Sequence, residues 1–217
     1  MKKIMFNDRY GLTEAVLQGR KTMIRRLCKE YLGDDIILAD DVFSRAFYSD
    51  ENIVEFLLRD GSLIVSVPPY KVGEVMAVAQ SYRDCENNQE VRFDDEFGTK
   101  GWNNKMFVCA DLMPNRIRFT DLKLEKLQDI SDEDCMREGI QAFDTPDGKV
   151  FVAGGVYVGQ DTRLKIAKGM INIAKSFKTP QEAFAVLIDK VSGKGTWDSN
   201  PFVFTYSFEL VREGGQQ

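Results

Sequence analysis

Residues 116–127 alternate between apolar and polar side chains over a length that favours an extended strand. The apolar positions of this segment are Ile117, Phe119, Leu122, Leu124 and Leu127. Since successive side chains of a strand point to opposite faces, the pattern predicts one long strand with a buried face, and the change of phase after Thr120 predicts a β-bulge. A second strand is predicted at 202–210, where Phe202, Phe204, Tyr206 and Phe208 share one face. The framework of the fold is therefore a sheet.

Two segments carry the start signals of helices. Thr179-Pro180-Gln181-Glu182 combines an N-cap threonine, a proline at the first helical position and a glutamate at the third. The helix that follows is predicted to end at Gly193 and to bury Phe184, Leu187, Ile188 and Val191. Ser131 is predicted to cap a shorter helix that ends at Gly139. Because strands dominate and the helices are short, we expect an α+β fold, a small β-barrel with short capping helices.

Two insertions interrupt this framework. Residues 27–68 are acidic and contain two apolar runs joined by Asp60-Gly61, a typical hairpin turn. Residues 141–178 show no clear period, and residues 83–105 are polar and predicted to form a long loop. We find no repeat and no linker, so residues 1–217 are predicted to form a single domain with these two insertions.

Composition excludes several classes of function. The net charge of −5 argues against a long nucleic-acid duplex and favours a small or single-stranded ligand. The chain has no histidine, and its four cysteines form no Cys-x-x-Cys pair, so we expect free thiols and neither a metal site nor a cofactor. No apolar run approaches the roughly 18 residues of a membrane span, and no signal peptide is visible, so the prediction is a cytoplasmic protein without a membrane partner.

One dense basic cluster precedes the first insertion. Arg20, Lys21, Arg25 and Arg26 follow Gly19 closely, and an extended backbone would place Lys21 and Arg25 on one face. The cluster is either a solvated strand edge, which lysine and arginine protect from pairing, or a site for an anion or a phosphate. Both interpretations stay open at this point.

Glu138 is the second candidate residue. It lies just before Gly139 at the predicted end of a helix, where a carboxylate opposes the helix dipole. This misfit suggests a partner cation, for which Lys21 is the candidate, whereas the alternative is an ordinary exposed glutamate.

The segment Gly193-Lys194-Gly195-Thr196 invites comparison with a phosphate-binding loop. The pattern G-x-x-x-x-G-K-[ST] is absent, however, and the segment follows a helix rather than preceding one. We interpret it as part of a loop that presents Trp197 to stack on a base and Asn200 to read a base edge. Tyr82 is a further candidate for stacking, and packing of Trp197 in the core is the alternative.

The basic cluster also carries a family resemblance. The segment Gly19–Arg26 resembles the opening signature of the ASCH domain family, G-x-K-x-x-[E/T]-x-R. Further similar blocks follow in the same order: Pro69–Glu74, Leu112–Ile117, Leu127–Asp134 with Glu138–Ile140, and Trp197–Val203. The last set is similar to ASCH proteins of phages and prophages, including those of gut bacteria. The similarity skips residues of about 27–68, 83–104 and 141–178. Each block alone is weak, but five in order are specific.

The resemblance implies a PUA-like β-barrel, a fold that is often tied to RNA binding. One branch of the family hydrolyses N4-acetylcytidine with a lysine and a threonine of the signature and a glutamate of the later helix. The lysine and glutamate correspond to Lys21 and Glu138, but Ile24 stands at the threonine position and has no hydroxyl group. Thr22 shares the face of Ile24 about 7 Å away, too far to take over its role.

Three functions follow from these observations. The first is binding of RNA or a nucleotide-like ligand in a pocket of mixed charge, with Arg20, Lys21, Thr22, Arg25, Arg26, Glu138 and the polar or aromatic residues Tyr82, Trp197 and Asn200 as its contacts. The second is hydrolysis of an acylated or modified nucleoside, with Lys21 and Glu138 as catalytic residues. The third is a protein-interaction module of a phage or mobile element, in which the insertions bind the partner.

Overall fold

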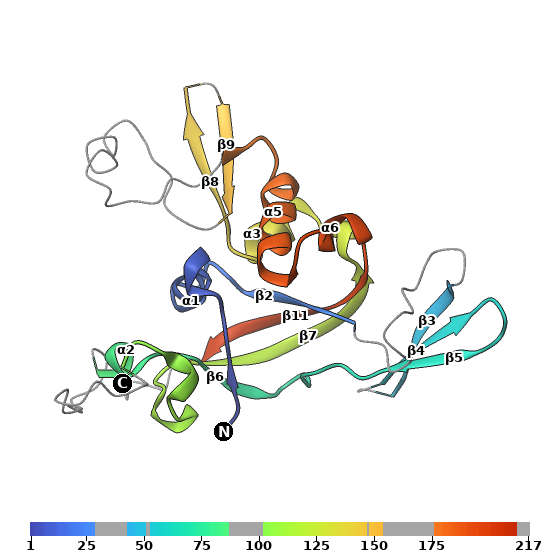
Figure 1. Cartoon of the computed structure of the whole chain (residues 1–217), viewed down its shortest axis with the longest axis horizontal. Coiled ribbons are helices and arrows are strands. Elements are labelled where there is room, and N and C mark those ends of the chain that lie inside the picture. Colours follow the sequence, from blue (N-terminus) through green and yellow to red (C-terminus); the bar gives the residue numbers. More distant parts are fainter. Residues whose placement is uncertain (29–42, 51–52, 87–101, 147, 154–175, 212–217) are drawn as a thin grey trace.

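The computed structural model describes residues 1–28, 43–50, 53–86, 102–146, 148–153 and 176–211. Its central element is a five-stranded sheet with the order β1-β6-β7-β11-β2 (Figure 1). The strands are β1 (Lys3–Ile4), β2 (Met23–Leu27), β6 (Val75–Val78), β7 (Arg116–Lys126) and β11 (Phe202–Val211). β1 pairs with β6 in parallel, and the other neighbours pair antiparallel.

The two longest strands of this sheet match the sequence pattern. β7 and β11 are paired along their length, and their register shifts where Asp121 faces Ser207 while Phe119 faces Phe208. Thr120 is therefore the extra residue of a bulge, which confirms the predicted change of phase. Ile117 and Phe119 on β7 are fully buried, as their alternation with polar residues requires.

The structure confirms an α+β fold, with several sheets and few helices. It does not confirm a closed barrel. Among the residues that the structure describes, the hydrogen-bonded order of the central sheet starts at β1 and stops at β2, and no pairing joins these two strands. The described part of the chain also has no helix long and apolar enough to cross a membrane.

The helices begin where the sequence predicts. Ser131 accepts a hydrogen bond from the backbone N–H of Asp134 at the start of α3 (Asp132–Arg137), and Thr179 and Glu182 form a complete capping box at the start of α5 (Pro180–Ser192). The remaining short elements are η1 (Asp8–Tyr10), α1 (Leu12–Leu17), α2 (Tyr82–Glu86), η2 (Lys105–Phe107), η3 (Ala110–Leu112), η4 (Leu127–Asp129) and α6 (Thr196–Ser199).

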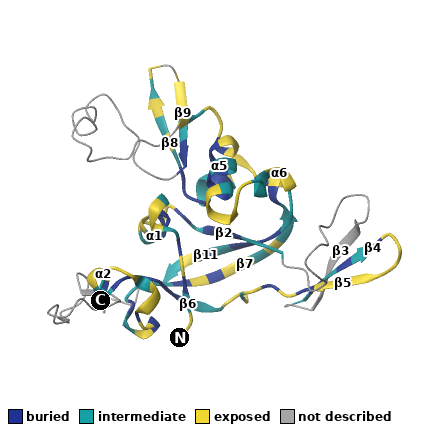
Figure 2. Ribbon diagram, viewed as in Figure 1, coloured by how far each residue is buried: buried dark blue, intermediate teal, exposed yellow. Residues whose placement is uncertain are grey.

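Helix α5 differs from the prediction at one residue. Phe184, Leu187 and Ile188 are buried, but Val191 is 42% exposed. Val191 lies in the last turn, where the helix borders a small cavity rather than the packed core. Figure 2 shows the buried residues gathered on α5 and along the central strands.

The described parts of the first insertion form a sheet. β3 (Phe43–Asp50), β4 (Ile53–Leu58) and β5 (Leu63–Ser66) pair antiparallel in the order β3-β4-β5. The predicted hairpin turn is confirmed, since Gly61 has a φ of 87°, which a glycine adopts readily. Phe56 of β4 is fully buried, and its ring centroid lies 5.3 Å from that of Phe202 on β11. This sheet is therefore attached to the main core.

The second insertion is more regular than the sequence suggests. β8 (Ile140–Thr145), β9 (Gly148–Ala153) and β10 (Ser176–Phe177) form an antiparallel sheet in the order β10-β9-β8, and Ile140 and Ala153 join the main core. The sequence of 141–178 shows no clear period because the side-chain alternation of β8 and β9 is too irregular to reveal these strands. Residues 154–175 lie outside the described part, as do residues 87–101 of the predicted 83–105 loop, which has α2 and η2 at its ends.

The capping box of α5 offers a test of this architecture. We expect Thr179→Ala to lower the free energy of unfolding by about 1 kcal/mol, because the substitution leaves an N–H at the helix start without its acceptor. Thr120→Ala, at the exposed bulge, is the matched control and should change the free energy of unfolding by less than about 0.5 kcal/mol. Urea unfolding followed by circular dichroism measures both. An equal effect of the two substitutions would contradict the role of the cap.

Candidate functional site

A backbone hydrogen bond joins the two segments that carry Lys21 and Glu138. The N–H of Thr22 donates to the carbonyl of Arg137 at the end of α3, over a distance of 2.9 Å. Glu138 is the C-cap of α3, and Gly139 follows with a φ of 104°, a backbone conformation that favours glycine. This arrangement turns the chain from α3 into β8 and leaves Glu138 beside Lys21.

Lys21 and Glu138 form a buried ion pair, as their sequence context predicts. The Lys21 ammonium donates to the Oε2 atom of Glu138 at 2.5 Å and to the backbone carbonyl of Glu138 at 2.9 Å. The two side chains are 3% and 6% exposed. The ammonium therefore compensates both the carboxylate and the negative end of the helix.

Arg25 extends this pair into a network. Its NH1 atom donates to the Oε1 atom of Glu138 at 3.0 Å, and its NH2 atom donates to the Oε1 atom of Glu125 at 2.7 Å. Asp134 lies 3.6 Å from the same NH2 atom, and Thr205 donates to the Oε1 atom of Glu125 at 2.8 Å. The guanidinium of Arg25 also lies over an aromatic ring, that of Phe184, at 5.7 Å from the centroid. The network connects β2, α3, β7 and β11.

Burial sets the protonation behaviour of this network. Desolvation lowers the pKa of Lys21 below its ordinary value, and the neighbouring cations Arg25 and Arg26 act in the same direction, whereas Glu138 opposes the shift. Desolvation also opposes the charge of Arg25, but Glu138 and Glu125 outweigh it and raise the pKa of Arg25. Arg25 therefore keeps its charge and remains a cation beside Glu138 when Lys21 loses its proton.

The ion pair borders a small cavity. This cavity has a volume of about 70 Å³, and its polar lining consists mainly of Lys21, Arg25, Arg26 and Glu138. The apolar side of the cavity is formed largely by α5, with Phe184, Leu187 and Ile188. Such a volume admits a small substituent or a few water molecules but no whole nucleoside.

A larger cleft lies beside this cavity. It has a volume of about 660 Å³, within the range of ligand sites. The cleft is lined by Arg25, Arg26, Leu27, Val67, Pro68, Pro69, Ser192 and Phe204. The two hollows share Arg25, Arg26 and Ser192, so a ligand in the cleft would reach the small cavity past the arginines.

The structure brings four of the predicted residues together, namely Lys21, Arg25, Arg26 and Glu138. Arg20 is exposed, and its Nε atom donates to Gln18 at 2.8 Å. Thr22 accepts a hydrogen bond from the Nε atom of Arg137 at 3.3 Å. Neither Arg20 nor Thr22 lines the cavity or the cleft.

The predicted stacking and base-reading residues serve other contacts. Trp197 packs edge-on against Phe184 at 6.1 Å between ring centroids, so the packing alternative holds for its ring. The Oδ1 atom of Asn200 accepts a hydrogen bond from the backbone N–H of Gln128 at 2.8 Å. Tyr82 belongs to α2 and packs against a separate apolar cluster that includes Ala79 and Cys85. None of these three residues lines the two hollows.

Sequence reasoning missed several residues of the site. Glu125 and Asp134 bind Arg25, and Pro68 and Pro69 form a wall of the cleft. Asp134 can be recognised in the sequence as an acidic residue in the first turn of α3. An acid at this position is already explained by its stabilisation of the helix start, so the sequence suggests no further role for it. Glu125 has no such signal, since polar residues alternate along the whole of β7.

No group of three or more potential metal ligands occurs in the described parts of the chain, and the four cysteines are free thiols. Cys135 of α3 is buried near the network, and desolvation raises its pKa to about 12. Its thiol stays protonated at neutral pH and is no nucleophile.

Comparison with known proteins adds no family to this description. No family model, no curated protein and no solved structure matches the chain.

The charge distribution of the network predicts an order of stability effects. Glu138→Gln should lower the free energy of unfolding by about 3–5 kcal/mol, because it leaves the buried ammonium of Lys21 without a carboxylate. Lys21→Met should cost less, because Arg25 still compensates Glu138. Arg118→Gln, which breaks an exposed ion pair with Glu209, is the control and should cost less than about 1 kcal/mol. Urea unfolding measures all three, and a greater loss in Lys21→Met than in Glu138→Gln would contradict this view.

Proposed function

We propose that this protein binds a nucleotide-like ligand, a nucleoside or an unpaired nucleotide of RNA, in the cleft beside the Lys21–Glu138 pair. The observation that carries the proposal is the burial of a complete ion pair at the edge of a cavity adjoining a cleft of ligand size. Charged side chains are rarely buried without a functional or structural reason, and clefts with a few convergent polar groups are typical ligand sites.

The shape of the two hollows suggests how such a ligand would lie. The cleft of about 660 Å³ has room for a sugar and a base, and the cavity of about 70 Å³ has room for a substituent on the base. There, Lys21 would donate to a carbonyl oxygen, and Glu138 would accept from an amino group. The edge of a base presents a carbonyl oxygen and an amino group side by side. A simple cation or anion would match only one of the two side chains.

We further propose that the chain is a member of the ASCH family with a PUA-like fold. Support comes from the five similar sequence blocks in order, and from an α+β fold with several sheets and few helices. The resemblance pairs a signature lysine with a later glutamate, and the positions that carry these residues, Lys21 and Glu138, lie in contact.

Ligand screening by thermal unfolding tests the binding proposal. At a ligand concentration of about 100 times Kd, binding adds about 2.7 kcal/mol to the stability of the wild type, which raises Tm by several degrees. We expect this rise with nucleosides, nucleotides or short single-stranded RNAs, and its loss in Lys21→Met. Lys123→Met, an exposed lysine of β7, is the matched control and should respond as the wild type does. Equal shifts in Lys21→Met and wild type would place the ligand elsewhere.

A second candidate function is hydrolysis of an amide bond on a modified nucleoside. The observation that favours it is the lowered pKa of Lys21, in contact with a carboxylate at 2.5 Å. A neutral Lys21 amine would take a proton from water as the water oxygen bonds to the acyl carbon. The resulting ammonium would then give this proton to the leaving nitrogen as the C–N bond breaks, with Glu138 stabilising the ammonium.

The nucleophile of this reaction would be water rather than a side chain. Ile24 lines the small cavity at the position where the resemblance implies a threonine, and an isoleucine offers no hydroxyl group. Thr22 does not replace it, because its hydroxyl is bound to Arg137.

Incubation with N4-acetylcytidine tests the second candidate. Deacetylation is expected in the wild type, and Lys21→Met should reduce the rate by about 10²–10⁴-fold, the usual contribution of a general base. The rate should rise with pH as Lys21 loses its proton, with a midpoint below the ordinary lysine value of 10.5. A rate that is independent of pH, or that survives in Lys21→Met, would exclude Lys21 as the base.

A further inference from the structure

The four cations of the predicted basic cluster differ in whether a carboxylate of the protein neutralises their charge. Lys21 and Arg25 are bound to carboxylates inside the protein, and Arg20 is solvent-exposed. Arg26 forms no ion pair and no hydrogen bond through its side chain within the described parts of the chain. Its Nε atom, like that of Arg25, is buried and has no hydrogen-bond partner among the described residues, but Arg26 lacks the carboxylate contacts that Arg25 makes through its other nitrogens. A buried donor without an acceptor is costly, and in a native protein it calls for an explanation.

The guanidinium of Arg26 is held against an aromatic ring. It lies over Tyr70, at 5.7 Å from the ring centroid. Tyr70 is itself fixed, because its ring stacks on Phe119 at 4.8 Å and its backbone N–H and carbonyl both bind the hydroxyl of Tyr206. An arginine held on a fixed ring is pre-organised, so it loses little conformational freedom when it binds a ligand.

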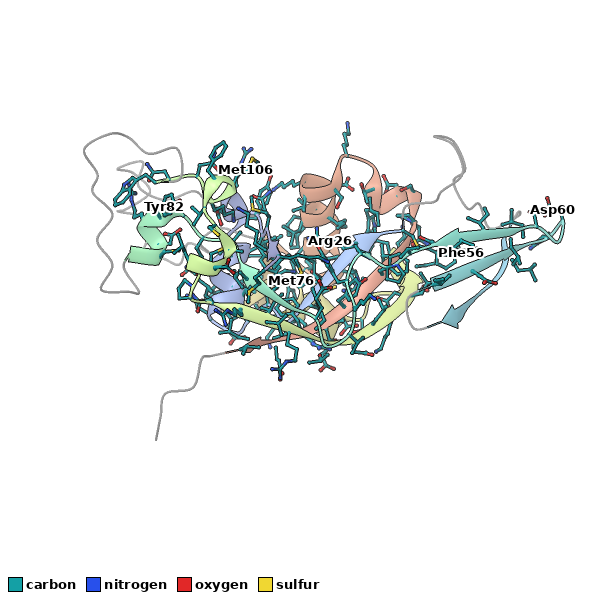
Figure 3. The ribbon with its side chains drawn as sticks, turned by 90° about the horizontal axis from the view of Figure 1, so that it is seen from below. Arg26, Phe56, Asp60, Met76, Tyr82 and Met106 are labelled. Atoms are coloured by element: carbon teal, nitrogen blue, oxygen red, sulfur yellow. The ribbon has the colours of Figure 1, made fainter. Side chains whose placement is uncertain are left out.

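Arg26 lines both hollows of the site. It belongs to the walls of the small cavity and of the large cleft. In the view of Figure 3, Arg26 lies in the middle of the molecule, between Met76 on the five-stranded sheet and Phe56 on the three-stranded sheet. Apart from the two arginines and Ser192, the described residues of the cleft walls are apolar, namely Leu27, Val67, Pro68, Pro69 and Phe204. Apolar walls strengthen the attraction of an arginine for an anion.

We propose that the ligand carries one phosphate group and that Arg26 binds this group in the cleft. The contact of the uncharged part of the ligand with Lys21 and Glu138 is taken from the proposed function, and the inference rests on it to that extent. The site would therefore select a nucleoside monophosphate, or one phosphodiester of a single strand, over the free nucleoside. Arg25 does not share this role, because Glu138 and Glu125 already neutralise it.

Binding of matched ligands tests the selectivity. Calorimetric titration compares each ribonucleoside with its 5′-monophosphate on wild type, Arg26→Gln and Arg26→Lys. We expect the monophosphate to bind the wild type about tenfold tighter or more, as a charge-assisted contact allows. Arg26→Gln should remove this preference, and Arg26→Lys should restore part of it.

Arg118→Gln removes one positive charge from an exposed residue that does not line the cleft, and it serves as the control, so it should keep the full preference. Equal affinities for nucleoside and monophosphate in the wild type would overturn the inference. A preference that persists in Arg26→Gln would overturn it as well.

A second measurement separates this inference from the proposed function. Inorganic phosphate and phenyl phosphate are titrated into the wild type while the Nε–H resonance of Arg26 is followed by NMR. A saturable shift of that resonance without any binding of nucleosides would support the phosphate site and refute the proposed function. No shift with either probe would refute the phosphate site, even if nucleosides bind.

Discussion

The buried ion pair between Lys21 and Glu138 is the interaction on which this structure depends. Taking two charges out of water is costly, and the cost is recovered only where the pair has good geometry and further hydrogen bonds. Here the helix-end carbonyl and Arg25 supply these bonds. A chain that needed stability alone would gain as much from apolar residues at these positions. The proposed binding of a ligand beside this pair is a physical reason to keep the charges.

Arg25 supplies a second counter-charge to the carboxylate of this ion pair. Because Arg25 binds Glu138 and Glu125 together, the carboxylate of Glu138 keeps a counter-charge in either protonation state of Lys21. Lys21 can therefore lose its proton without leaving the buried Glu138 without a counter-charge. The same contacts tie β2 to α3 and β7, so the site and the packing of the sheet on the helices share the same side chains.

Much of the framework was readable in the sequence. The bulge at Thr120, both helix caps and the partnership of Lys21 with Glu138 follow from periodicity and from the misfit of a carboxylate at a helix end. Other features depend on contacts between distant segments. The role of Glu125 and the proline wall of the cleft have no local signal, and Trp197 is equally suited to a core or a ligand by its chemistry. Closure of the sheet into a barrel was predicted and is not confirmed.

The register of β2 against β11 decides which of two adjacent arginines meets carboxylates. Arg25 lies opposite Thr205 and Arg26 opposite Phe204. Neighbouring residues of a strand face opposite ways, so a slip by one position would exchange their surroundings. Deleting a single residue between Gly19 and Leu27 would leave the overall charge pattern nearly intact. It would nevertheless change which arginine side chain faces the buried carboxylates. Insertions and deletions in this short segment should therefore be far less tolerated than substitutions of its exposed residues.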